Sequence, residues 1–281
     1  MGFGCNAAGV IGCRIINSAR EKIIAMVTNA FVPCNGRFPM LITISSIFIA
    51  SYFANQYSSI ISTIVVLLVV LLGIILTLII SNLLSKTILK GEKTSFILEL
   101  PPYRKPQIIK TIIQSIINKI IFVLGRAVLI AAPAGIVIWL LANLSINDVT
   151  LLNYIANFLN PFAQVIGLDG YILTAFILGL PANEVVLPII LMSYLSNNQL
   201  MRIDDIKSIG DILVQNGWNI LTAINTMLIC LLHFPCSTTL LTIKKESGKW
   251  RWVALAFILP LICGILVCLF TTFVYNILLR M

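Results

Sequence analysis

The chain has 281 residues, of which 59% are hydrophobic and only 10% are charged, and its formal net charge is +9. Soluble domains carry about 25% charged residues, so this composition excludes an ordinary soluble domain and predicts a protein that works in or across a bilayer. The basic excess does not indicate nucleic-acid binding, because the Lys and Arg residues gather at the ends of apolar segments, where they set topology and meet anionic lipid head groups.

The first interruption of the apolar pattern is the segment from Pro33 to Pro39, which divides two apolar arms near the N-terminus. The chain then has no Lys, Arg, Asp or Glu from Phe38 to Ser85. A spanning helix needs about 20 apolar residues, so this stretch predicts two helices that meet near the polar residues 55–59.

The next segment, from Leu84 to Ile120, is basic and contains prolines. Lys86 to Lys119 carries seven Lys or Arg residues against two acids, which predicts a cytoplasmic location by the positive-inside rule. Residues 98–106 must be extended around their prolines, and Gln107–Ile120 repeats apolar residues at helical spacing. We therefore expect an interfacial helix here, with a plain loop as the alternative.

Three further apolar segments follow, at Phe122–Asn143, Tyr171–Leu195 and Trp218–Ile243, before a second basic stretch from Lys244 to Arg251. Three full crossings would put the two basic stretches on opposite sides, so at least one segment should be re-entrant or cross an even number of times.

Two of these segments contain prolines that should break their helices, at Leu180–Glu184 and at His233–Cys236. Broken backbone is tolerated at membrane depth only when protein or a polar cavity surrounds it, and paired broken helices indicate the substrate site of a transporter. Ser145–Asp169 is expected to be an outer loop with a short amphipathic helix. The residues around Asp204, Asp205, Lys207 and Asp211 are expected to form a polar surface hairpin.

Glu184 is the one acidic residue within an apolar segment, and an intramembrane carboxylate is a functional hypothesis by default. The alternative is a structural role, in a pair with Arg126 or at a helix N-terminus. His233 and Cys236 are three residues apart on a broken helix, so His233 is either a metal ligand or a hydrogen-bonded core residue.

The seven cysteines are an odd number and lie mostly inside apolar segments, which argues against a disulfide framework. Cys5 and Cys34 each precede an asparagine, Asn6 and Asn35, and lie beside glycine or proline. Thiolate, imidazole and carboxylate together suit Fe²⁺, Zn²⁺ or Cu⁺ better than Mg²⁺ or Ca²⁺. Four other cysteines lack polar neighbours in the sequence and are predicted to pack in the core: Cys13, Cys230, Cys263 and Cys268.

No nucleotide-binding loop and no dinucleotide fingerprint are present in the sequence. A catalytic Cys-His-Asp arrangement has little support, because no orienting acid follows His233 beyond Glu246. The sequence therefore predicts a transporter or a scaffold and not an enzyme.

Five motifs occur in one order: Gly-Phe-Gly-Cys-Asn (2–6), Pro-Cys-Asn-Gly-Arg-Phe-Pro (33–39), Glu-Leu-Pro-Pro-Tyr-Arg-Lys-Pro (99–106), Pro-Ala-Asn-Glu (181–184) and His-Phe-Pro-Cys-Ser-Thr-Thr (233–239). Together they resemble the C-terminal membrane region of FeoB-type ferrous iron transporters over essentially the whole chain. Residues from Gly125 to about Leu240 resemble the second nucleoside-recognition (Gate) domain of that family.

The resemblance implies an all-α polytopic transmembrane bundle with broken or re-entrant helices. Three parts are expected: a FeoB C-terminal-like membrane segment at 1–85, a basic connector at 86–120, and a Gate-like domain with the final helix at 121–281. It also implies Fe²⁺ uptake across the bacterial inner membrane, with Fe²⁺ as the transported substrate and no permanently bound cofactor. The family's GTP-binding domain and first Gate are expected on a separate or missing N-terminal half, which would be the main partner besides the lipid bilayer. A homo-oligomer is compatible with this arrangement.

The family's residues transfer to this sequence motif by motif. The metal ligands implied are Cys5, Cys34, Cys236, Glu184 and His233, although many family members carry an aromatic residue at the position of His233. Support of the transport path is implied for Asn6, Asn35 and Asn183. Structural motif residues are Arg37, Pro39, Glu99, Pro101, Pro102, Arg104, Pro181 and Pro235. Two alternatives remain at this point: a Gate-type transporter of a nucleoside or another divalent metal, and a non-transporting scaffold.

Overall fold

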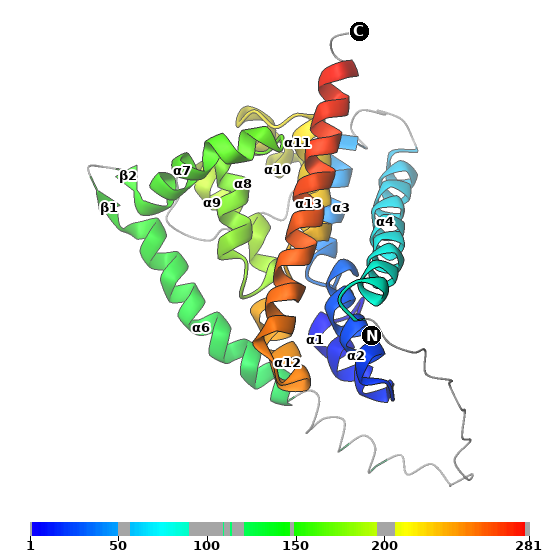
Figure 1. Cartoon of the computed structure of the whole chain (residues 1–281). Coiled ribbons are helices and arrows are strands. Elements are labelled where there is room, and N and C mark those ends of the chain that lie inside the picture. Colours follow the sequence, from blue (N-terminus) through cyan, green and yellow to red (C-terminus); the bar gives the residue numbers. More distant parts are fainter. Residues whose placement is uncertain are drawn as a thin grey trace.

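The computed structural model describes residues 2–49, 57–89, 109, 113, 121–146, 149–195 and 206–278. These residues form an almost entirely helical molecule (Figure 1). The N-terminal part contains α1 (Asn6–Gly12), η1 (Cys13–Ile15), α2 (Ala19–Thr28), η2 (Asn29–Phe31), α3 (Phe38–Ile44), η3 (Ser45–Ile49) and α4 (Ser58–Lys86). The remainder contains α6 (Phe122–Asn143), β1 (Ser145–Ile146), β2 (Val149–Thr150), α7 (Leu151–Val165), α8 (Gly170–Leu178), η5 (Asn183–Val185), α9 (Val186–Leu195), α10 (Ile206–Gln215), α11 (Ile220–Leu232), α12 (Ser237–Ser247) and α13 (Trp250–Leu278).

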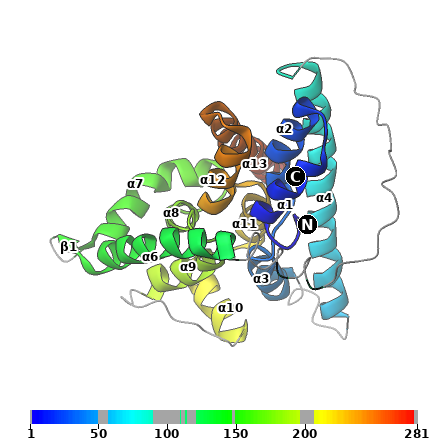
Figure 2. The ribbon, with the colours of Figure 1, turned by 90° about the horizontal axis from the view of Figure 1, so that it is seen from below.

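Helices α11 and α13 pack against each other in the middle of the molecule, with α4 on one side and α6 and α7 on the other (Figure 2). Among the described residues three helices are long and apolar enough to cross a bilayer: Ser59–Lys86, Ile220–Ser247 and Trp250–Leu278. Helices α7 and α8 meet at an angle of 111° and would add a fourth if they form one broken span. The chain is therefore a multi-pass helical membrane protein, as its composition predicts.

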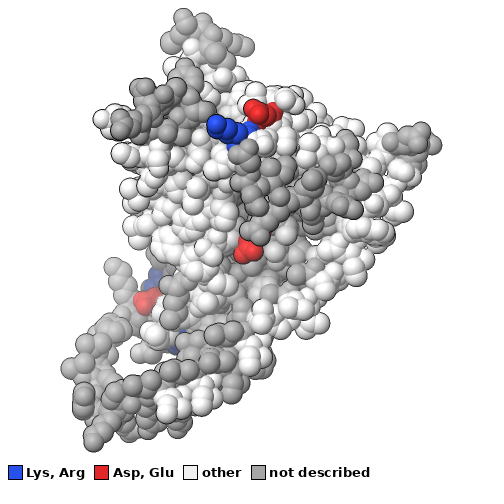
Figure 3. All heavy atoms as spheres, turned by 180° about the vertical axis from the view of Figure 1, so that it is seen from behind, with Lys and Arg blue, Asp and Glu red and all other residues white. Residues whose placement is uncertain are grey.

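The described surface agrees with a lipid environment. Seen from behind, few charged side chains are visible on the part of the surface that the structure describes, and most of that surface is uncharged (Figure 3). Long apolar rows on α4, α6 and α13 are exposed, for example Leu78 on α4 and Leu129 on α6. In a bilayer such side chains contact acyl chains and need no protein partner.

The expected helix interruptions are all present. The segment predicted at Phe122–Asn143 is α6 with the same bounds, Tyr171–Leu195 is divided into α8, η5 and α9, and Trp218–Ile243 is divided into α11 and α12. The amphipathic helix expected in the outer loop is α7, and a two-stranded hairpin, β1–β2, precedes it.

One expectation was wrong. The segment predicted as a polar hairpin contains α10, whose Ile209 and Leu213 are buried in the core. Apolar residues at positions 206, 209, 212 and 213 recur at helical spacing, so the helix buries one face while Lys207 and Asp211 remain exposed. The interfacial helix expected at Gln107–Ile120 falls mainly outside the described residues.

The two basic stretches, Lys86 to Lys119 and Lys244 to Arg251, begin on the same side of the molecule. Arg20 on α2 donates to the main-chain oxygens of Ser85, at 2.9 Å, and Leu89, just past the end of α4. Arg14 and Lys22 pair with Glu246 near the end of α12, at 2.6 and 3.9 Å. This shared end is the arrangement that the positive-inside rule requires of two cytoplasmic stretches.

Asn225 fixes α11 to the rest of the bundle. It is fully buried, and its Nδ2 donates to Ile166 O at 2.8 Å and to Thr272 Oγ1 at 2.9 Å. Its Oδ1 accepts a hydrogen bond from Thr271 Oγ1 at 2.5 Å. One amide thus connects the turn between α7 and α8 with α11 and α13, which is a common use of polar side chains between membrane helices.

Candidate functional site

Three chain interruptions meet at one place, and one of them is the break between α11 and α12. They are the segment Pro33–Arg37 before α3, the segment Leu180–Glu184 between α8 and α9, and the segment His233–Cys236. The main-chain nitrogen of Ser237 donates to Leu180 O at 2.9 Å, which joins the second and third interruptions. The prolines in these segments, including Pro181 and Pro235, lie outside the regular helices, while Pro39 lies in the first turn of α3, where its missing N–H costs nothing.

The N-terminal Cys-Asn motif joins the first interruption. Asn35 N donates to Gly4 O at 3.2 Å, so the chain segments that carry Cys5 and Cys34 lie against each other. Asn6 is buried, and in the amide orientation that suits its neighbours its Nδ2 donates to Gly2 O at 3.1 Å and Val32 O at 3.2 Å. The two repeated Cys-Asn pairs therefore form one folded unit.

Asn183 connects the thiol of Cys34 with the imidazole of His233. The side-chain amide of Asn183 lies 3.6 Å from Cys34 Sγ and 3.2 Å from His233 Nε2. His233 Nδ1 lies 3.1 Å from Ile229 O and 2.9 Å from Cys230 O. Both of these are acceptors, so Nδ1 carries the ring proton. Asn183 Nδ2 donates to Cys34 Sγ, and its Oδ1 faces His233 Nε2, so one amide bridges the thiol and the imidazole.

Cys236 occupies the N-cap position of α12. Its Sγ lies 3.2 Å from Thr239 Oγ1. The neighbouring Ser237 Oγ is buried and has no hydrogen-bond partner among the described residues. Cys5, Cys34 and Cys236 thus come from three chain segments to one region.

Glu184 lies next to this region, and its side chain is exposed. It packs over Gly36: a Cβ added there would lie 3.0 Å from Glu184 Cγ and 3.4 Å from Oε1. Glycine at position 36 therefore allows the carboxylate to approach the Cys34 loop. The alternative role expected for Glu184 was a pair with Arg126, and the side chain of Arg126 lies outside the described residues.

Arg37 is fully buried at the centre of the same region. Its Nη1 donates to Ala30 O at 3.1 Å and Leu231 O at 2.8 Å, and its Nη2 donates to His233 O at 3.1 Å and Phe234 O at 3.3 Å. Arg37 therefore links the first interruption to the end of α11. The motif residues Glu99, Pro101, Pro102 and Arg104 lie outside the described residues.

The cysteines of this region do not form a closed coordination sphere among the described residues. Among the described residues no group of three His, Cys, Asp or Glu side chains is placed to hold a metal ion. The metal-ligand roles therefore stay predictions. Of the four cysteines predicted to pack in the core, Cys230 and Cys268 are buried. Cys13 and Cys263 are half-buried, and Cys13 Sγ donates to Gly9 O at 3.4 Å.

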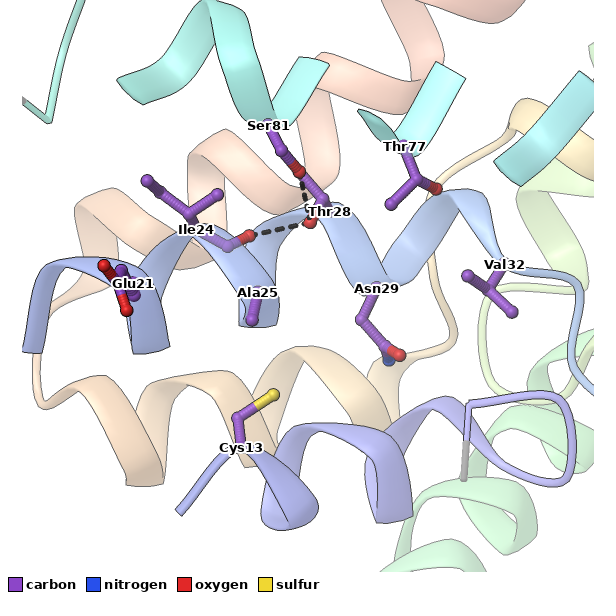
Figure 4. A pocket seen from close by; sticks show the side chains of 9 residues that line it. All are labelled: Cys13, Glu21, Ile24, Ala25, Thr28, Asn29, Val32, Thr77 and Ser81. Atoms are coloured by element: carbon purple, nitrogen blue, oxygen red, sulfur yellow. Dashed lines mark hydrogen bonds between the residues drawn. The ribbon is translucent and has the colours of Figure 1, made fainter. Parts of the chain in front are cut away.

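An open cavity of about 410 Å³ is lined by residues of η1, α2, η2 and α4 and by Val32 (Figure 4). It is lined by Cys13, Glu21, Ile24, Ala25, Thr28, Asn29, Val32, Thr77 and Ser81. Asn29 in this lining donates through Nδ2 to Asn6 O at 2.9 Å, at the first residue of α1. This cavity leaves no signal in the sequence, because its walls come from elements that are separated along the chain, from η1 to α4.

Sequence reasoning also missed Asn225 and the hydrogen-bonded group of Asp169, Tyr194 and Trp218. Tyr194 OH donates to the Asp169 carboxylate, and Trp218 Nε1 donates to Tyr194 OH at 2.8 Å. Each of these is a single polar side chain within or beside an apolar segment, and this pattern is the sequence signal that could have identified them. Both sets hold helices together and lie outside the cysteine region.

Comparisons with known proteins agree with the resemblance found in the sequence. A family profile for the C terminus of ferrous iron transport protein B matches residues 66–118, and a nucleoside-recognition (Gate) profile matches residues 124–250. The Fe(2+) transporter FeoB of Staphylococcus aureus (strain MSSA476) is 30% identical over 93% of this chain and 38% of the relative. FeoB of Methanocaldococcus jannaschii is 26% identical over 99% of this chain and 41% of the relative.

A third relative is a Porphyromonas gingivalis protein named as a fusion of Fe(2+) transport protein A with FeoB. It is 25% identical over 92% of this chain and 35% of the relative. The chain thus spans less than half the length of these curated relatives. No solved structure matches it.

Proposed function

The chain carries the FeoB C-terminal region followed by a Gate region, and from this we propose that it is the membrane permease portion of a ferrous iron transporter. We infer that it moves Fe²⁺ across the bacterial inner membrane together with the remaining FeoB regions, present on the same or on a second polypeptide. The observation that supports the proposal is the meeting of three chain interruptions, joined by the Asn183–Cys34 contact and by the hydrogen bond from Ser237 N, next to Cys236, to Leu180 O.

In this proposal Fe²⁺ passes the cysteine region through weak and successive contacts. Cys34 and Cys236 supply sulfur, Cys5 a further ligand, and Glu184 negative charge, with His233 as an additional donor. A borderline-soft ion such as Fe²⁺ suits thiol and imidazole ligands. Successive weak sites favour transport over storage, because an ion held in a closed tetrahedral cage would not leave.

The asparagines support this path by holding its segments. Asn183 contacts Cys34 and His233, and Asn6 bonds the main chain at Val32, directly before the loop that carries Cys34. The main-chain nitrogen of Asn35 joins that loop to Gly4. No nucleotide chemistry is assigned to this chain, so any use of GTP belongs to the other FeoB regions. The membrane potential contributes about 2.3 kcal/mol per charge per 100 mV, and a divalent cation gains twice that.

The test is uptake of radioactive Fe²⁺ in cells that lack their own ferrous transporter. We expect uptake when the chain is expressed with the N-terminal half of a FeoB-type transporter, and background uptake with either part alone. Assembly of the two parts without uptake would favour a scaffold, which is the second candidate.

A nucleoside transporter is the remaining rival, since part of the chain matches a nucleoside-recognition profile. Alkylation of the cysteines separates the two functions. Fe²⁺ is expected to slow alkylation of Cys34 and Cys236, and adenosine or uridine to have no effect. Protection by a nucleoside and not by Fe²⁺ would assign the site to the rival.

Replacing Glu184 with glutamine is expected to lower Fe²⁺ uptake about tenfold, the lower end of what loss of a metal-site residue costs. Because the side chain is exposed, the free energy of unfolding should change by no more than about 0.5 kcal/mol. Uptake assays and thermal unfolding in detergent measure the two effects. The matched control is Asp211→Asn, an exposed acid on α10, which should leave both unchanged. Unfolding of E184Q at a much lower temperature would instead indicate the structural role.

A further inference from the structure

Arg37 is a buried charge without an acidic partner among the residues that the structure describes. None of its side chain is exposed, and the ion pairs that the structure describes involve Glu246 with Arg14 and Lys22. Burying a guanidinium is costly unless hydrogen bonds and opposite charge compensate it. The compensation here comes from main-chain oxygens, so the surroundings of Arg37 form a cation site made of carbonyl groups.

These carbonyl groups are available because two helices end at the same place. Helix α11 ends at Leu232, and His233 after it is extended, with φ −75° and ψ 169°. The oxygens of Leu231, His233 and Phe234 therefore have no donor within their own helix. Ala30 O comes from η2, directly before the first interruption. Helix C-termini carry partial negative charge, which favours a cation at this point.

The arrangement is the one that transporters with broken helices use to hold a cation. Unwound carbonyls and helix C-termini coordinate ions such as Na⁺ in those proteins. In this chain the guanidinium of Arg37 occupies the corresponding place, with donor distances of 2.8 to 3.3 Å. An arginine side chain remains charged at any physiological pH, so the site stays filled.

We propose that Arg37 is a tethered cation that fills the carbonyl site at the end of α11 and excludes hard monovalent cations from it. Uncharged carbonyl oxygens suit K⁺ and Na⁺, whereas thiols suit softer metals. Cys236 follows Phe234 by two residues, so the carbonyl oxygens and the thiol belong to the same break. Arg37 thus leaves the sulfur side of the break as the place open to a metal ion. This inference goes beyond the proposed iron path and holds whichever substrate the chain carries.

The test uses Arg37→Ala in the purified full chain, with thermal unfolding measured in choline chloride, NaCl, KCl and dilute guanidinium chloride. The variant should unfold at a lower temperature than the wild type in choline. Small cations should then raise its unfolding temperature by roughly 5 °C or more, because a ligand that binds only the folded state stabilises it. The wild type should change by less than about 1 °C, since its site is already occupied.

A matched control removes bulk from α3, the helix that directly follows Arg37, without opening the carbonyl site. Met40→Ala on α3 replaces another buried side chain, and it should lower the unfolding temperature without any response to the cation. Equal responses of R37A and M40A to Na⁺, K⁺ and guanidinium would overturn the proposal. No iron is present in this assay, so its outcome is independent of whether the chain transports iron.

If R37A does not accumulate in membranes, two further variants test whether Arg37 acts as a tethered cation. Arg37→Lys keeps a tethered cation, whereas Arg37→Gln keeps hydrogen-bond donors without the charge. We expect R37K to accumulate and to unfold independently of Na⁺ and K⁺, and R37Q to accumulate poorly. Equal accumulation of R37K and R37Q would assign Arg37 a hydrogen-bonding role alone and overturn the tethered cation.

Discussion

Replacing Gly170 with valine is expected to prevent the correct folding of the chain, at a cost of more than about 4 kcal/mol. Gly170 is the first residue of α8, at the 111° bend that follows α7. A Cβ at this position would lie 1.9 Å from Ala156 O, 2.8 Å from Ala156 C and 3.0 Å from Asn160 N. All three atoms belong to the main chain of α7, so no side-chain rotation relieves the contact.

The bend also depends on hydrogen bonds that a displaced Gly170 would lose. Gly170 N donates to Asn160 Oδ1 at 3.1 Å, and Asp169 Oδ1 accepts from Ile172 N at 2.7 Å. Separating α7 from α8 would therefore expose donors that have no water to replace their partners within a bilayer. We expect G170V to elute as aggregate in detergent and to be cleaved rapidly by protease.

The matched control is Gly135→Val on α6, where an added Cβ meets no atom within 4 Å. This variant should behave as the wild type within about 1 kcal/mol, since only helix propensity changes. Size-exclusion chromatography and thermal unfolding compare the two variants. A monodisperse G170V with a wild-type unfolding temperature would show that α7 and α8 do not pack as described.

The positions of the helix breaks could be predicted because proline and polar residues interrupt long apolar runs. Leu180–Glu184 and His233–Cys236 are interruptions of this kind, and both separate helices in the structure. Proline alone was not sufficient, since Pro133, Pro161 and Pro260 lie inside helices. The interruptions that break the chain combine proline with polar side chains that find partners in other segments.

The interactions within the cysteine region could not be predicted to the same extent. Arg37 was identified as a motif residue, but its partners are main-chain oxygens of Leu231, His233 and Phe234, about 195 residues away. Main-chain groups leave no signal in a sequence, and their availability depends on where α11 ends. The same holds for the contact of Gly36 with Glu184, which arises only when the two interruptions are packed together.

The α10 segment shows that charged residues on one face can make a half-buried helix resemble a surface hairpin in the sequence. Its residues carry Lys207 and Asp211 on one side, which favoured a surface hairpin. Gly210 contacts Ile47 of η3, so the opposite side of the helix packs into the core. The helical spacing of the apolar residues was the stronger signal, because an exposed charge is compatible with a half-buried helix.

Replacing Cys34 and Cys236 together with serine is expected to reduce Fe²⁺ uptake to background while the chain still folds. Loss of one metal-site residue typically costs 10- to 100-fold in affinity or activity, so loss of both thiols should exceed either single change. Serine nearly matches cysteine in size and can keep the contacts with Asn183 and Thr239, so any effect on unfolding should stay within about 2 kcal/mol. The change therefore separates soft-ligand chemistry from packing.

The control for this variant is Cys268→Ser, a buried thiol that donates to Asn225 O at 3.6 Å, away from the three interruptions. Uptake of radioactive Fe²⁺ in co-expressing cells and thermal unfolding in detergent are measured for both proteins. C268S should retain uptake, because its thiol lies between α11 and α13 and not beside Cys34. Wild-type uptake by the double variant would remove Cys34 and Cys236 from the path. Cys5, Glu184, His233 and main-chain oxygens would then be the remaining candidate ligands, a set with less sulfur that favours harder divalent cations.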